Sequence, residues 1–182
     1  KVASDLRLLS MGPRAGISEI ALPAVQPGSS IMPGKVNPSV PEMVNQVCFQ
    51  VMGCDTTICA AAEAGQLELN VMMPVIAWNG LHETAILREA MKALTTRCVD
   101  GIEANPERCR ELMDRSTAVA TALSPYIGYA ATADIAKTAV KTGKTIRELV
   151  LERGLMEARQ LDRVLSAEVM TRPGIAGAET KK

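Results

Sequence analysis

Residues 28–38, Gly-Ser-Ser-Ile-Met-Pro-Gly-Lys-Val-Asn-Pro, bring together the chemical groups that bind an anion. Glycines allow backbone N–H groups to face a ligand, Lys35 adds a full positive charge, and Asn37 and the two serines add neutral donors. A helix that starts directly after the segment would add the positive end of its dipole. A carboxylate fits this composition better than a nucleotide does.

Two other interpretations of this segment have to be weighed. A P-loop for nucleotide phosphates is excluded, because Lys35 is followed by Val36 rather than by serine or threonine. The same prolines and glycines would also suit a surface loop that only turns the chain, and composition by itself leaves that interpretation open.

The helix after this segment has clear sequence signals. Ser39 is expected to be its N-cap, Pro41 suits the first turn, and Glu42 stands three residues after Ser39, as a capping box requires. Helical spacing of apolar residues predicts that the helix runs from about residue 41 to 64, where Gly65 ends it. The stripe consists of Val44, Val47, Cys48, Val51 and Ile58.

A second long helix is expected from about residue 70 to 99, with a length of roughly 40 Å. These two helices carry more apolar surface than they can bury against each other, so we expect partner helices from other segments or from other subunits. Upstream, the spacing predicts a helix within residues 1–11, and alternation in residues 17–22 allows a short strand.

The elements become short after Asp100-Gly101, and we expect a domain boundary there, with one domain over residues 1–100 and a small helical domain over residues 101–182. The second domain is expected to contain four helices: one opening at Asn105, then residues 128–143, 145–153 and 155–166. Thr145 and Glu148 form a second capping box. The tail from about residue 171 is expected to fray.

Composition favours an all-α fold. Of the 182 residues, 47% are hydrophobic but only 2% are aromatic, so aliphatic side chains must build the core. Twenty basic residues balance twenty acidic ones, which gives no positive field for nucleic acid. No apolar run is long enough to span a membrane and no signal peptide is recognisable, so we expect a cytoplasmic protein with no membrane partner.

Three other residue types attract attention. The five cysteines form no CxxC pair and have one histidine, His82, to join them, so no metal site is expected and buried free thiols are favoured. His82 is expected at a surface or interface rather than in catalysis. Asp55 falls on the expected apolar stripe, as a partnered carboxylate at a subunit contact or as a sign that the stripe is misdrawn.

The frame Gly28-Ser29-Ser30-x-Met32-Pro33-x-Lys35-x-Asn37 resembles, at every specified position, the signature of the fumarase/aspartase superfamily, lyases that form fumarate by elimination. Within that superfamily, residues 40–49 and 61–72 look like the aspartase branch. Fumarases usually have a Ser-Gly-Asn-type turn in place of residues 64–66 and phenylalanine in place of Met72. The resemblance runs from about residue 1 to 173.

The resemblance implies an enzyme that eliminates ammonia from L-aspartate without a cofactor or a metal ligand in this segment. Ser29 matches the catalytic base, and Ser30, Lys35 and Asn37 match positions around the substrate carboxylate. In the family Glu42 pairs with a histidine from a region outside this chain, although its role as a capping glutamate is equally consistent with the sequence. Fumarase, acting on malate, is the alternative enzyme.

The resemblance also implies a homotetramer whose long helices form one bundle and whose active sites combine three subunits. The expected partners are therefore a small dicarboxylate or amino-acid substrate and further copies of the chain. Because the motifs here grip one carboxylate only, the isolated 182-residue chain is expected to be inactive, and a non-catalytic oligomerisation module remains an alternative.

Overall fold

A computed structural model describes residues 1–177 and divides the chain into two compact units, Lys1–Pro106 and Glu107–Lys182. Helices dominate both units, and the described strands are two residues long each, so the predicted all-α class is confirmed. The first unit continues past residue 100, because strand β2 (Glu103–Ala104) pairs with β1 (Ile20–Ala21) of the same unit.

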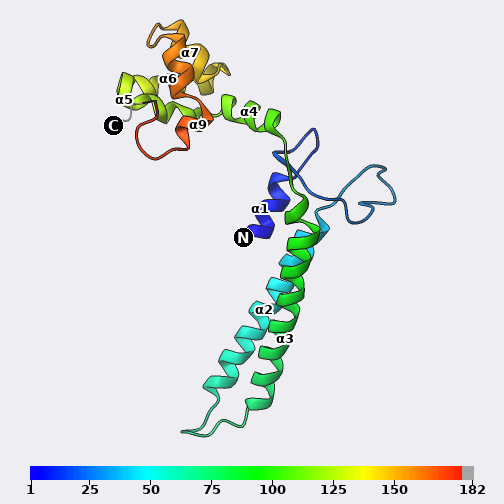
Figure 1. The fold of residues 1–182 in the computed structure, drawn as a ribbon. Coiled ribbons are helices and arrows are strands. Elements are labelled where there is room, and N and C mark those ends of the chain that lie inside the picture. Colours follow the sequence, from blue (N-terminus) through cyan, green and yellow to red (C-terminus); the bar gives the residue numbers. More distant parts are fainter. Residues whose placement is uncertain (178–182) are drawn as a thin grey trace. The chain divides into compact units, whose positions relative to one another are not determined.

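The first unit is built on a long helical hairpin, with the short helix α1 (Val2–Leu9) beside it (Figure 1). Helix α2 (Ser39–Glu63) and helix α3 (Met73–Arg97) have 25 residues each and lie side by side (Figure 1). Small and aliphatic residues are buried where α1, α2 and α3 meet; they are Ala3, Val40, Val44, Ala90, Leu94 and Cys98. Both predicted long helices are therefore present.

The start of α2 differs from the expectation. The helix begins at Ser39 with Pro38 at the N-cap position, and no side chain caps it, so the predicted capping box is wrong. The Ser39 hydroxyl instead accepts a hydrogen bond of 2.8 Å from Gln26 Nε2. The side-chain amide of Gln26, thirteen residues upstream, thus binds the hydroxyl that was expected to cap α2.

The apolar stripe of α2 passes through Cys54, which is 2% exposed, while the neighbouring Asp55 is exposed. Within this chain Asp55 therefore lies beside the stripe, and its predicted role as a partnered carboxylate at a subunit contact stays a prediction. His82 is also exposed and stacks on Trp78 one turn earlier, with ring centroids 6.2 Å apart. This agrees with the expectation that His82 lies on a surface.

The predicted strand over residues 17–22 is much shorter than expected. Only Ile20 and Ala21 pair, with Ala104 and Glu103 respectively. Ser18 has a φ of 53°, a left-handed conformation that interrupts an extended strand. A 3₁₀ turn, η1 (Val99–Gly101), then joins α3 to β2.

The second unit consists of short helices around a separate aliphatic core. Its elements are α4 (Pro106–Arg115), the 3₁₀ helix η2 (Thr117–Leu123), α5 (Ser124–Ile127), α6 (Tyr129–Thr142), α7 (Ile146–Glu152), α8 (Ala158–Val164) and α9 (Ala167–Met170). The side chains of Leu123, Ile135, Val150, Leu161 and Val164 are 0% exposed.

Local signals in this unit were mostly reliable. The capping box of Thr145 and Glu148 is present in both directions at the start of α7, as predicted. The helix predicted over residues 128–143 is α6, and Gly143 follows it with a left-handed φ of 73°. Val140 was expected on the buried face but is 74% exposed, and the helix expected over residues 155–166 covers Ala158–Val164 only.

The other sequence expectations have mixed outcomes. Cys54 and Cys98 are buried free thiols, whereas Cys59 is exposed. Within residues 1–177, no helix is long and apolar enough to cross a membrane, and no group of three metal-binding side chains occurs. Tyr126 Oη donates a 2.7 Å hydrogen bond to the carbonyl of Ala176, which anchors that part of the tail. Fraying was expected from about residue 171 onward, and residues 178–182 of that tail lie outside the described part.

Candidate functional site

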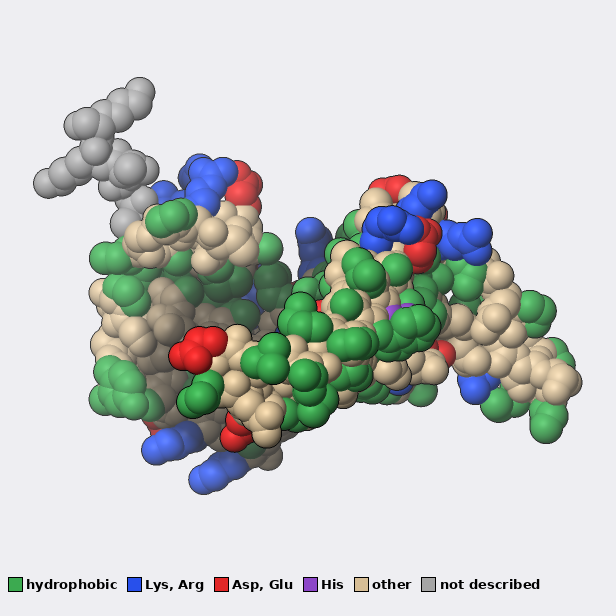
Figure 2. Space-filling view, turned by 90° about the horizontal axis from the view of Figure 1, so that it is seen from below, with side chains coloured by type: hydrophobic (Ala, Val, Ile, Leu, Met, Phe, Trp, Pro, Cys, Tyr) green, Lys and Arg blue, Asp and Glu red, His purple; other side chains and the backbone are tan. Residues whose placement is uncertain are grey.

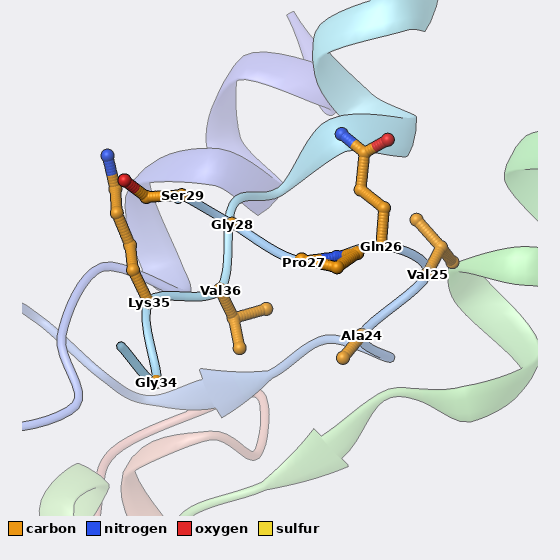
Figure 3. A pocket seen from close by; sticks show the side chains of 9 residues that line it. All are labelled: Ala24, Val25, Gln26, Pro27, Gly28, Ser29, Gly34, Lys35 and Val36. Atoms are coloured by element: carbon orange, nitrogen blue, oxygen red, sulfur yellow. The ribbon is translucent and has the colours of Figure 1, made fainter. Parts of the chain in front are cut away.

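Residues 28–38, the segment predicted to bind an anion, form a loop between β1 and the start of α2. It borders a surface depression of about 470 Å³, lined by Ala24 to Ser29 on one side and by Gly34, Lys35 and Val36 on the other (Figure 3). Two passages of the same loop therefore face each other across the depression. This geometry brings Ser29 and Lys35 to one site although they are six residues apart in sequence.

A close backbone crossing brings the two passages together. The Asn37 amide donates a 2.8 Å hydrogen bond from Nδ2 to the carbonyl of Gly28, joining the ends of the loop. A Cβ atom at Gly28 would lie 2.0 Å from the carbonyl oxygen of Lys35. Only glycine allows this approach, because a backbone atom cannot move aside as a flexible side chain can.

The hydroxyl of Ser29 is surrounded by backbone donors. The N–H groups of Ile31 and Met32 donate to Ser29 Oγ over 3.1 and 3.2 Å, and the Lys35 N–H closes the following turn on the Met32 carbonyl. Donors aimed at one oxygen stabilise negative charge on it. Two donors of the kind that stabilise negative charge are therefore already directed at the Ser29 oxygen.

Lys35 supplies the charge of the site. Its side chain is exposed and extends to the same side of the loop as that of Ser29 (Figure 3). Among residues 1–177, no carboxylate forms an ion pair with Lys35, so its ammonium group is available to an anionic ligand. The depression is thus bordered by one cation and by a hydroxyl that accepts two backbone hydrogen bonds.

The other predicted site residues are placed differently. Asn37 is half-buried and uses one amide hydrogen for the loop closure, which leaves the second for a ligand. Ser30 is exposed and does not line the depression. Glu42 lies one turn into α2, where its Oε1 is 3.9 Å from Nη2 of Arg7 on α1. The structure therefore groups Ser29 with Lys35 and directs Glu42 toward α1.

Sequence reasoning missed Gln26 as a component of the site. Gln26 lines the depression and also holds Ser39, so it ties the upstream passage of the loop to the first residue of α2. The only signal for it was a polar residue directly before the Pro27-Gly28 pair.

Models of known families match both ends of the chain. The family described as Lyase matches residues 1–53, which include the whole loop, and the family described as Fumarase C C-terminus matches residues 119–172 in the second unit.

Curated relatives match nearly the whole chain. The aspartate ammonia-lyase of Bacillus subtilis (strain 168) is 51% identical over 179 residues, which are 98% of this chain and 38% of that protein. The aspartate ammonia-lyase of Helicobacter pylori (strain ATCC 700392 / 26695) is 53% identical over 173 residues, 95% of this chain and 37% of that protein. The chain therefore spans little more than a third of the length of these relatives.

Two solved structures have the same fold over almost all of the chain. The fumarate lyase:delta crystallin from Brucella melitensis bound to cobalt is 55% identical with a TM-score of 0.85, covering 94% of this chain and 37% of that chain. The recombinant class II fumarase from Schistosoma mansoni is 41% identical with a TM-score of 0.87, covering 94% of this chain and 36% of that chain.

Proposed function

Because this chain belongs to the fumarase/aspartase superfamily of lyases, we propose that it forms part of an enzyme that eliminates ammonia from L-aspartate to give fumarate. The observation that carries the proposal is that the Ser29 hydroxyl, held by two backbone N–H groups, borders the same depression as Lys35, whose ammonium has no ion-pair partner within residues 1–177. This arrangement combines a base with a cation for the substrate's carboxylate.

The difficult step in this reaction is the removal of a proton from the carbon beside a carboxylate, a very weak acid. The electron pair left on carbon moves onto the carboxylate, giving an aci-carboxylate with additional negative charge on its oxygens. It then returns to form the C=C bond as the C–N bond breaks and ammonia leaves. Groups that hold the aci-carboxylate more tightly than the substrate lower the barrier.

We assign the roles of the loop residues on this basis. Ser29 takes the proton, because its alkoxide would be stabilised by the N–H groups of Ile31 and Met32. Lys35 and the second amide hydrogen of Asn37 hold the carboxylate on which charge develops. Ser30 lies outside the depression, so the loop has to turn before its hydroxyl can reach the substrate. Glu42 holds a proton-carrying side chain contributed from outside this chain.

L-aspartate is favoured over malate by the relatives named above and by residues 40–49 and 61–72, which resemble the aspartase branch. Fumarase activity is the second candidate, supported by the family model over residues 119–172 and by the class II fumarase structure. Both reactions would use the loop in the same way, because malate and aspartate share the carboxylate and the acidic carbon.

We also propose that the enzyme is a homotetramer in the cytoplasm. The hairpin exposes large apolar side chains, including Phe49 at 63%, Trp78 at 72% and Leu81 at 75%. Figure 2 shows apolar side chains gathered on the surface of this region. Such a surface rarely stays in water, and further copies of the same hairpin would cover it. Free cysteines suit a reducing compartment.

The test is a pair of assays on the polypeptide that carries this chain, with L-aspartate and with L-malate, following fumarate by its ultraviolet absorbance. We expect fumarate from L-aspartate, and a Ser29→Ala variant as control should form almost none. Fumarate from L-malate alone would favour the second candidate. Fumarate from neither substrate would leave the chain as an oligomerisation module and overturn the proposal.

A further inference from the structure

Arg7 and Glu42 form the ion pair that connects α1 with the first turn of α2. Arg7 Nη2 lies 3.9 Å from Glu42 Oε1, and the two side chains are 43% and 39% exposed. This separation is too long for a hydrogen bond, so the contact acts through charge. The described part of the chain gives neither group another ion-pair partner.

The register between the two helices is set by packing, which makes the pair more than a chance surface contact. One turn away, Nδ2 of the buried Asn45 donates a 3.2 Å hydrogen bond to Ser4 Oγ. Ala3 of α1 is 6% exposed and packs in the same cluster as Val44 of α2. Moving forward along α1 from Ser4 to Arg7 corresponds to moving backward along α2 from Asn45 to Glu42, so the helices run antiparallel.

The backbone of Glu42 is hydrogen-bonded within α2, whereas its carboxylate does not cap that helix. The Glu42 N–H donates to the Pro38 carbonyl over 3.0 Å, as the helix requires. The capping box that would have turned the carboxylate back toward Ser39 is not formed. The carboxylate therefore extends toward α1, where Arg7 is the charge that faces it.

We infer that Arg7 is a positioning residue for the reaction, which holds the Glu42 carboxylate in place at the base of the loop. This inference rests on the proposed function, because Glu42 acts there on a proton-carrying group. Exposed ion pairs contribute little to stability, so replacement of Arg7 should lower kcat and leave the free energy of unfolding almost unchanged. The effect passes through Glu42 and should leave substrate binding by Lys35 unchanged.

The experiment is a double-mutant cycle on the polypeptide that carries this chain, with kcat and KM for L-aspartate measured for Arg7→Gln, Glu42→Gln and the double variant. We expect Arg7→Gln to lower kcat about five- to tenfold, the scale of one charge pair at this distance near water, with KM changed less than twofold. Arg7→Lys should restore most of the loss because it keeps the charge. Arg97→Gln, an equal loss of charge at an exposed site on α3, should leave kcat unchanged.

The decisive comparison is the effect of Arg7→Gln in the Glu42→Gln background. We expect no further loss of kcat there, since the residue through which Arg7 acts is already neutral. An equal loss in both backgrounds, an unchanged kcat in Arg7→Gln, or failure of Arg7→Lys to restore turnover would overturn the inference while the wild-type enzyme still forms fumarate. A wild-type enzyme that forms no fumarate would overturn the proposed function, and this inference with it.

Discussion

Replacement of Gly28 by alanine tests directly whether the backbone crossing in the loop creates the site. The added Cβ would lie 2.0 Å from the Lys35 carbonyl oxygen and 2.5 Å from its carbonyl carbon. Both are backbone atoms, so a side-chain rotation cannot relieve the contact. The two passages of the loop must separate, and Lys35 must move away from Ser29.

The size of this movement follows from the contact distance. Cβ atoms essentially never approach heavy atoms within 3.0 Å, so the gap has to widen by about 1 Å. A 1 Å displacement of a group that positions substrate costs roughly a hundredfold in rate. The hydrogen bond from Asn37 to the Gly28 carbonyl would be strained as well, at a cost on the order of 1 kcal/mol. We therefore expect a large loss of activity with a small loss of stability.

The assay is kcat/KM for L-aspartate, together with a thermal melt, on the polypeptide that carries this chain. Gly34→Ala in the same loop is the matched control: its Cβ would meet nothing within 4 Å, and its φ of 79° would add strain of only about 1 kcal/mol. We expect the control to stay within tenfold of the wild type. Equal activities of the Gly28 and Gly34 variants would refute the reasoning, because the crossing would then have no part in arranging the site.

Ser29→Ala should lower kcat at least about a hundredfold, as expected for loss of a positioned base, with the oligomer intact by light scattering; near-normal turnover would place the base elsewhere. Leu161→Ala, at a site that is 0% exposed, should destabilise the second unit by about 2–5 kcal/mol in urea unfolding. The backbone N–H and hydroxyl of Thr145 lower the pKa of Glu148. The ionised Glu148 carboxylate therefore stabilises the fold fully at pH values above the usual glutamate pKa, and this stabilisation is lost as the pH falls through the lowered pKa. In Glu148→Gln, the free energy of unfolding should therefore fall less steeply as the pH drops through the acid range. An unchanged slope would contradict this. Finally, the 182-residue chain should self-associate at micromolar concentration in sedimentation equilibrium, since its hairpin exposes several large apolar side chains; a folded monomer would disprove it.

Local patterns in the sequence were sufficient for most of the helices. The two long helices follow from apolar spacing, and the start of α7 follows from Thr145 and Glu148, whose reciprocal bonds span three residues. These features depend on residues within a few positions of each other, which lie close together in any helix. The prediction was wrong where a residue far along the chain binds the same group. Ser39 looks like an N-cap until Gln26 is brought to its hydroxyl.

In the candidate site, too, the residue types can be read from the sequence and the geometry cannot. The groups behind the prediction of an anion-binding loop are visible in the sequence, because glycines, serines, Lys35 and Asn37 lie within one short segment. Its geometry is not visible there. That Gly28 passes against the Lys35 carbonyl, and that Asn37 closes the loop on Gly28, depends on the path of the backbone between them.

For this protein, the sequence by itself determined the all-α class, the hairpin and the donor groups present in the loop, because periodicity and side-chain groups are properties of short segments. Tertiary structure alone decided that Glu42 faces Arg7 instead of capping its own helix. The physical reason is that α1 packs on α2 in one register, set by Ala3 and by the hydrogen bond between Asn45 and Ser4. Such a register is fixed when the surfaces of two helices are buried against each other, and it cannot be read from the sequence of either helix alone.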